Sequence, residues 1–354
     1  MIATISQKVK THQRVTVQEA MWLHEHATDD QLSTLATTVK CRFHNKDTAT
    51  HLIMAIVNYT NVCVAKCDYC AFYKLPGEKG AYLNDLETVC GKIDELLGHG
   101  GTLLSFNGGF HPKLRLDDYA ELFSAIHARY PGIAFYELTV AEFMFLCKVS
   151  KKSYAEGAAQ LAAAGTAWVT GGGAEVLEAG FRKRHSPLKY TVEDYYTAQR
   201  AILDAGMGST ATMTIGFDET LTERMKHLET LRKFQDDTDG GLTSFLCWTF
   251  KPDNTPIGGQ EISTDAYLRW IAICRIYLDN FTHIRASVLT QNNNAMRALL
   301  MGADDFDLPT EDEVTQSAGA TISHNFNHIL EHARALGLNP QKRAPFSDAN
   351  QRKR

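Results

Sequence analysis

The sequence lacks the features that mark membrane, secreted and nucleic-acid-binding proteins. No apolar run approaches the ~18 residues that a membrane span needs, and the opening segment, MIATISQKVKTHQR, has no apolar core of a secretory signal. Acidic residues outnumber basic ones by 41 to 36, which argues against a nucleic-acid partner. We therefore expect a cytoplasmic protein that acts on a small molecule.

Cysteine is also sparse, and its distribution is informative. Five of the eight cysteines are scattered singly, and the other three, Cys63, Cys67 and Cys70, share the segment NYTNVCVAKCDYCAFYKL. Three thiolates at C-x3-C-x2-C spacing can hold three irons of a cubane cluster and leave the fourth iron open to a small molecule. A structural zinc site would need a fourth ligand, for which His44 or His111 is available. We predict a [4Fe–4S] cluster on the three cysteines.

The remainder of the chain alternates between apolar runs and amphipathic segments. Strand-like runs begin at Thr50, Gly101, Gly132, Thr166, Ser209, Leu242, His283 and, more weakly, Ala303. Helix-like segments separate them, which favours parallel strands joined by right-handed crossovers. We predict an α/β fold, a (β/α)8 barrel over residues 50–310, with a helical extension over 1–49 and a C-terminal helix and tail over 311–354. A partial (β/α)6 barrel with a C-terminal cap is the alternative.

In such a barrel, active-site residues collect where the strands end. The glycine-rich segments NGGFHP and GGGAE follow the second and fourth predicted strands. Their backbone and side chains are candidates to bind a cofactor, although ordinary turns and a helix-start glutamate would have the same sequence. The candidate cofactor-binding residues are Asn107, Gly108, Gly109, Gly172, Glu175, Ile215, Tyr69 and Arg184.

The cysteine spacing resembles that of radical S-adenosylmethionine (SAM) enzymes. Further segments, GGGAEVL with RKRHSP, TATMTIGFDET and FLCWTFKPDNT, resemble the dehypoxanthine futalosine cyclases of the futalosine route to menaquinone. The resemblance extends to about Gly319 and implies SAM as co-substrate, a barrel fold and a flavodoxin- or ferredoxin-type electron donor. It also implies hydrogen abstraction from ribose C4′, followed by ring closure onto the benzoate ring. Aminofutalosine synthase and the deazaflavin synthases are more distant relatives.

Several segments depart from the cyclase pattern at positions expected to face substrate. Asn107 stands in place of Gln, Thr170 in place of Pro, and LTVAE and TQNNNAMRA replace the usual ends of strands three and seven. Three alternatives therefore stay open. They are a paralogue acting on another nucleoside-like or aromatic substrate, an enzyme that adds its radical to a double bond as aminofutalosine synthase does, and a non-catalytic metal-binding barrel.

The reaction needs a proton acceptor and groups that bind the substrate. We expect acid–base catalysis from His111, Asp218 or Glu219, since each follows a predicted strand. A loop histidine and helix-start carboxylates are the alternative interpretations. The expected substrate-binding residues are Glu142, Thr170, Trp248, Phe250 and Asn292, although the aromatic side chains could equally belong to the core.

Overall fold

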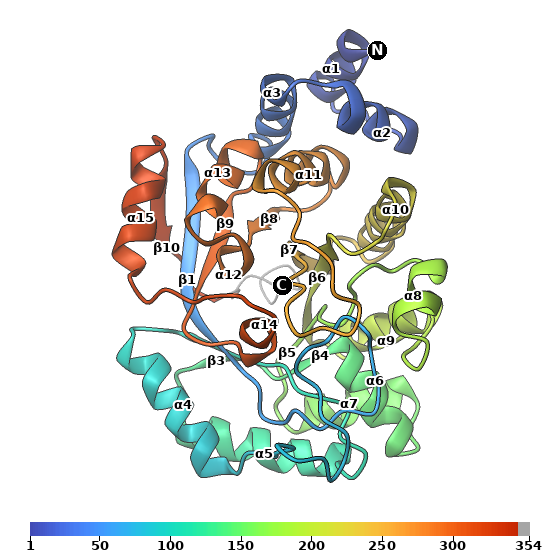
Figure 1. Cartoon of the computed structure of the whole chain (residues 1–354), viewed down its shortest axis with the longest axis vertical. Helices are drawn as coiled ribbons and strands as arrows, with labels where there is room; N and C mark the ends of the chain where they lie inside the picture. Colours follow the sequence, from blue (N-terminus) through green and yellow to red (C-terminus); the bar gives the residue numbers. More distant parts are fainter. Residues whose placement is uncertain (346–354) are drawn as a thin grey trace.

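The computed structural model describes residues 1–345 and contains a parallel α/β barrel preceded by three helices (Figure 1). Every strand pairing in the sheet is parallel, and β9 pairs with both β8 and β1, so the sheet returns to its first strand. The predicted (β/α)8 barrel is confirmed, including the weak eighth strand, and the six-unit alternative is wrong. The barrel strands are β1 Thr48–Val57, β2 Leu103–Phe106, β3 Ala134–Tyr136 with β4 Leu138–Thr139, β5 Trp168–Thr170, β6 Gly208–Ile215, β7 Leu242–Thr249, β8 His283–Ala286 and β9 Asp305–Pro309.

One barrel strand is interrupted, because Glu137 separates β3 from β4. Its fully buried carboxylate accepts the backbone N–H groups of Ala167 and Trp168, at 3.0 Å each, and lies 3.2 Å from Nε2 of His127. A side chain thus takes backbone amides that a regular ladder would use. The Glu137 N–H still donates to the Trp168 carbonyl at 3.1 Å, so β3 and β4 act as one strand between β2 and β5.

Three of the barrel helices are followed by a glycine in the left-handed conformation. Gly100, Gly165 and Gly206 follow helices with φ of +72°, +95° and +85°, the left-handed conformation that favours glycine at a helix end. The longer helices around the strands are α4 Leu86–Gly98, α5 Leu116–Arg129, α6 Val140–Val149, α7 Tyr154–Ala163, α8 Ala179–His185, α9 Val192–Asp204, α10 Leu221–Asp237 and α11 Thr264–Tyr277. Short helices follow, α12 Val288–Gln291, α13 Ala295–Ala298 and α14 Glu313–Ser317, with two 3₁₀ turns at Asn292–Asn294 and Leu299–Met301.

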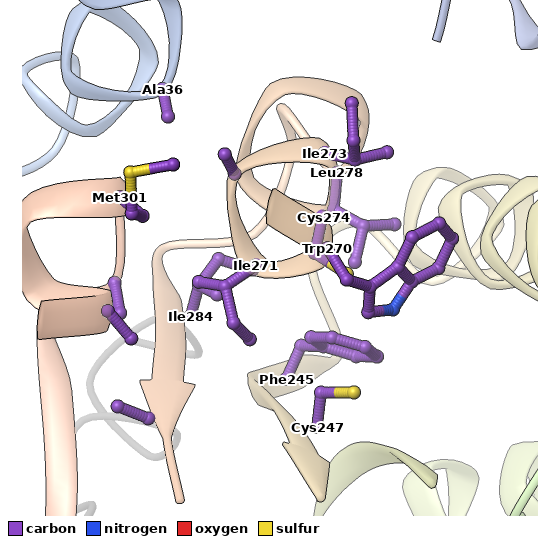
Figure 2. Packing of buried hydrophobic residues seen from close by; sticks show 14 of the residues in the cluster. Ala36, Phe245, Cys247, Trp270, Ile271, Ile273, Cys274, Leu278, Ile284 and Met301 are labelled. Atoms are coloured by element: carbon purple, nitrogen blue, oxygen red, sulfur yellow. The ribbon is translucent and has the colours of Figure 1, made fainter. Parts of the chain in front are cut away.

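The N-terminal helices share a hydrophobic core with the barrel. They are α1 Ile2–Lys10, α2 Val17–His26, which begins with a capping box of Thr16 and Glu19, and α3 Asp29–Lys40. Figure 2 shows Trp270, Ile271 and Cys274 of α11 beside Phe245 and Cys247 of β7 and Ile284 of β8, with Ala36 of α3 nearby. Helix α11 is therefore buried on more than one face, because α2 and α3 cover the face that the barrel leaves exposed.

The C-terminal segment contains the expected helix, α15 Phe326–Ala335, and a strand that the sequence pattern does not predict, β10 Asn339–Lys342. Strand β10 pairs in parallel with the first residues of β1, from Thr48 to His51, whereas β2 pairs with the later residues from Met54 to Val57. It covers a strand edge that would otherwise be open. The rest of the predicted tail, from residue 346, lies outside the described residues. Within residues 1–345, no helix is long and apolar enough to cross a membrane.

Candidate active site

The cysteine loop lies between β1 and α4 and is held by backbone hydrogen bonds. The Cys63 N–H donates to the Lys74 carbonyl at 2.9 Å, and the Lys74 N–H donates to the Asn61 carbonyl at 2.8 Å. Val64 is bonded in turn to the Phe110 carbonyl of the glycine turn after β2, at 3.2 Å. These bonds fix a loop without regular structure in one path, as a metal-binding segment requires.

The glycine turn after β2 is packed directly against this loop. A Cβ on Gly109 would lie 2.3 Å from the Val62 carbonyl oxygen and 2.8 Å from Cβ of Cys63. Glycine is therefore needed here so that one loop can approach the backbone of the other. The same holds in the triplet after β5, where a Cβ on Gly172 would lie 2.5 Å from Cγ2 of Thr139.

A cavity of about 300 Å³ opens at the carboxyl ends of the strands, and it brings together most of the predicted site residues. All three loop cysteines line it, none is in a disulfide, and no other cysteine of the described chain is among its lining residues. The predicted residues that share the cavity are Cys63, Cys67, Cys70, Tyr69, Asn107, Gly108, Gly109, Glu142, Thr170, Gly172, Glu175, Trp248 and Phe250.

Glu142 joins three strand ends at the wall of this cavity. Its Oε1 accepts the Tyr59 hydroxyl at 2.6 Å and the Gly108 N–H at 2.9 Å, and its Oε2 accepts the Thr139 N–H at 3.0 Å and hydroxyl at 2.5 Å. Burial raises the pKa of Glu142, although the four donors favour the carboxylate. With all of these partners, Glu142 positions the turn that carries Gly108.

A buried cationic group faces the cysteines. Lys189 lies 3.3 Å from Oε1 of Glu175 and 3.1 Å from the Tyr69 hydroxyl, and Arg182 lies 3.8 Å from Oε2 of Glu175. Burial alone would lower the pKa of Lys189, but Cys67 and Glu175 outweigh it and hold this pKa well above its ordinary value. The two cations favour negative charge at this end of the cavity, which suits thiolates and the carboxylate of a ligand.

Aromatic and hydroxyl side chains make up much of the remaining wall. The rings of Phe217 and Phe250 have centroids 4.5 Å apart, and Phe217 also contacts Tyr69 at 5.4 Å. Arg285 and Asp307, two ionisable residues of the wall, form an ion pair with each other. The hydroxyl-bearing residues include Thr210, Thr212, Thr214, Thr249, Ser287, Thr290 and Thr315. Such a wall can pack against an aromatic ring and bind several polar atoms.

Three residues expected to act as acids or bases do not line the cavity. The carboxylate of Glu219 caps its own loop, accepting the Gly216 and Phe217 N–H groups at 2.8 Å each and pairing with Arg224 at 2.6 Å. Asp218 is half exposed and pairs with His185 Nε2 at 2.7 Å. The ring of His111 accepts the Lys113 N–H of its own loop at 3.4 Å. A position after a strand was therefore not sufficient to place these side chains in the site.

Three predicted ligand-binding residues also lie elsewhere. Arg184 is 41% exposed in its side chain and pairs with Glu223 at 2.8 Å. Ile215 is fully buried in the hydrophobic core. Asn292 follows α12 in a left-handed turn with φ of +49°. None of the three is among the residues that line the cavity.

Lys189, Phe217, Arg285 and Asp312 are among the cavity residues that were missed from the sequence. Phe217 carried a usable signal, because it stands in GFDET directly after a strand. Arg285 lies in the seventh predicted strand run, HIRASVL, where a charged residue at an inward position was the available sign. Lys189 and Asp312 lie in connecting segments that neither follow a predicted strand directly nor contain the cysteine motif, so the sequence gives no signal for them.

A second polar cluster, His44, His283 and Asp304, lies at the opposite end of the barrel, where β8 begins. His283 Nδ1 is 2.6 Å from Oδ2 of Asp304, and Arg275 pairs with the other oxygen of the same carboxylate. The guanidinium competes with any cation for this carboxylate, so the cluster serves to hold the barrel bottom together.

Known proteins match the chain along nearly its whole length. Residues 57–231 match the radical SAM superfamily, and residues 239–352 match the family described as the CofH/MqnC C-terminal region. The chain is 35% identical over 342 residues to the cyclic dehypoxanthine futalosine synthase of Halalkalibacterium halodurans, covering 96% of this chain and 92% of that protein. It is 32% identical over 324 residues to the aminodeoxyfutalosine synthase of Thermus thermophilus, covering 89% and 86%.

A solved structure has the same fold. The crystal structure of methylornithine synthase superposes with a TM-score of 0.71 at 14% identity, covering 95% of this chain and 97% of that one. The barrel, the three-cysteine loop and the sequence matches together define a radical SAM enzyme. Within that superfamily the chain belongs to the CofH/MqnC family.

This family implies a [4Fe–4S] cluster and SAM, and the residues present fit both groups. Three free thiols line one cavity without a fourth cysteine beside them among the described residues, which leaves one iron for a non-protein ligand. Burial raises the pKa of the Cys70 thiol to about 11, so iron is needed to hold it as a thiolate at neutral pH. Cys63, Cys67 and Cys70 would hold the cluster.

Proposed function

We propose that this enzyme closes a ring in dehypoxanthine futalosine, as a step toward menaquinone. The observation that carries the proposal is the 35% identity to a cyclic dehypoxanthine futalosine synthase over 96% of the chain. The bound cluster and SAM would supply a 5′-deoxyadenosyl radical, which takes the hydrogen from ribose C4′. The sugar carbon then bonds to the benzoate ring, and loss of one proton and one electron restores aromaticity.

The cavity residues give this reaction a binding site. Trp248 and Phe250 offer flat apolar surfaces for the benzoate ring, and hydroxyl groups such as Ser287 and Thr290 can bond the sugar. Lys189 and Arg182 supply positive charge beside the cysteines, which would favour the carboxylate of SAM there. The apolar wall keeps water from the radical, which would otherwise be exposed to side reactions.

The test is product analysis with the iron-loaded, reduced protein. We expect SAM and dehypoxanthine futalosine to give free 5′-deoxyadenosine and a product lighter than the substrate by two hydrogens, measured by mass spectrometry. The Cys67→Ala variant is the control and should give neither product. SAM cleavage without cyclised product would keep the enzyme class and discard this substrate, in favour of another nucleoside-like or aromatic molecule.

A radical addition of the aminodeoxyfutalosine synthase kind is the second candidate, favoured by the 32% identity to such an enzyme. The same assay distinguishes the two, since addition leaves the adenosyl group attached to the product. We also propose that a flavodoxin- or ferredoxin-type protein supplies the electron, in the reducing cytoplasm that eight free thiols suit. Turnover that starts when reduced flavodoxin replaces a chemical reductant would support this donor, and its failure with both protein classes would exclude it.

A further inference from the structure

The segment between β9 and α15 brings a buried carboxylate into the cavity wall. Asp312, directly before α14, is 2% exposed and lines the cavity. One carboxylate oxygen, Oδ2, accepts a short hydrogen bond from the Thr315 hydroxyl. The other, Oδ1, has no hydrogen-bond partner among residues 1–345. A buried carboxylate oxygen without a partner is costly to keep and calls for an explanation, and in a cavity wall a catalytic role is one.

The charged neighbours of Asp312 form ion pairs with each other and not with Asp312. Lys92 of α4 pairs with Glu311 at 2.5 Å and with Glu313 at 3.4 Å, and Glu313 also accepts the Tyr82 hydroxyl at 2.7 Å. From the end of β1 the uncharged amide of Asn58 faces this segment, bonded to the Glu313 N–H at 2.7 Å.

On the far side of the same segment, His324 bonds the Thr310 carbonyl at 2.8 Å. No ion pair within the described chain reaches Asp312. Burial raises the pKa of Asp312 to about 6, although Thr315 and the nearby amide of Asn58 favour the carboxylate.

The other carboxylates that line the cavity are already engaged. Glu142 has donors on both oxygens, and Glu175 pairs with Lys189. Asp307 pairs with Arg285. Asp312 is therefore the carboxylate of the cavity wall, within the described residues, that pairs with no cation and keeps one oxygen without a hydrogen bond, so it can take a proton there.

We infer that Asp312 is the proton acceptor that restores the aromatic ring after ring closure, an inference that rests on the proposed function. When C4′ has bonded to the ring, the attacked carbon carries both the new bond and its original hydrogen. Oδ1 of Asp312 takes that hydrogen as a proton, and the electron pair of the broken C–H bond returns to the ring. The one surplus electron leaves to a one-electron acceptor of the iron–sulfur class. The step ends with an aromatic ring and a protonated Asp312.

The test separates hydrogen abstraction from ring restoration. Asp312→Asn keeps the shape and the Thr315 contact but cannot accept a proton. We expect it to form 5′-deoxyadenosine at a rate within twofold of wild type, while the cyclised product per 5′-deoxyadenosine falls ~100-fold or more. Paramagnetic resonance of the frozen reaction should show an accumulated organic radical. Asp312→Glu should restore part of the product, and the matched control Glu313→Gln should resemble wild type.

The protonation of Asp312 is measured separately, on the resting protein. A carboxyl C=O infrared band should titrate near pH 6 in wild type and be missing in Asp312→Asn, and product formation by wild type should decline as pH falls through about 6. Absence of such a band would overturn the inference. So would Asp312→Asn with a wild-type product ratio, or with only a raised KM, which indicates substrate binding. Wild type that makes no cyclised product would overturn the proposed function, and this inference with it.

Discussion

The contact network of Glu142 allows a substitution to be worked through in detail. In Glu142→Gln, an NH₂ group replaces one of the two oxygens that accept four donors. The hydroxyls of Tyr59 and Thr139 can rotate to accept instead, but a backbone N–H cannot. Whichever way the amide is oriented, the N–H of Gly108 or of Thr139 then faces another donor.

An unsatisfied buried N–H costs ~1–3 kcal/mol, and the remaining bonds lose their charge assistance. The neutral amide offsets part of this loss, because burial raises the pKa of Glu142 and so disfavours its charged form. We expect the free energy of unfolding to fall by ~2 kcal/mol.

The assay is urea unfolding of the iron-free protein, since a bound cluster would add its own stability. Glu156→Gln is a matched control, because Glu156 begins α7 with the same capping box, accepting the Ser153 N–H at 2.8 Å and hydroxyl at 2.7 Å, but is exposed to water. Water can satisfy the displaced donors there, so its loss should be much smaller. Equal losses for the two variants would refute the reasoning from burial.

Other substitutions test the cysteine loop and the barrel wall. Alanine at any one of the three loop cysteines should abolish iron binding without unfolding the protein, whereas Cys41→Ala should leave iron content unchanged; iron analysis and circular dichroism check both. Gly109→Ala should lower iron content and cost ~1–3 kcal/mol of stability by overpacking, while Gly132→Ala, with open space around it, should do neither. Burial alone would raise the pKa of Asp305, but Arg343 and Arg285 hold it at about 2, below its ordinary value of 3.8. The stabilisation that these ion pairs give is present above about pH 4 and is lost as pH falls toward 2. The free energy of unfolding should therefore fall by about 2 kcal/mol less in Asp305→Asn than in wild type over this pH range.

The sequence predicts the barrel and the meeting of the cysteine loop with the glycine-rich segments, because both follow from period and spacing. Parallel strands end at one edge, so segments such as NGG and GGGAE had to meet the cysteine loop wherever the strands were correctly placed. Even Ala303 to Leu308, the faintest strand pattern, is recovered, since β9 must fill the gap between β8 and β1. The interruption at Glu137 is not predictable in this way, because it depends on a carboxylate competing for backbone amides across the sheet.

The sequence does not predict the direction in which a side chain points. Asp218 and Glu219 do follow a strand, but they bond to nearby histidine and backbone groups instead of facing the cavity. The reverse holds for Asp312, which belongs to a segment with no recognisable pattern and yet lines the cavity. Local sequence determines where a residue is along an element; only the packing of distant segments determines which residue faces the substrate.

The pairing of β10 with β1 makes part of the fold around the cysteine loop depend on residues far along the chain. Thr48 of β1 lies beside Asn339 of β10. Asn58 and Tyr82, on either side of the cysteine loop in the sequence, are both hydrogen-bonded to Glu313. These partners can meet only after residues 313 and 339 have been synthesised. The segment that carries the three cysteines therefore gains these long-range contacts late in folding, well after its own synthesis.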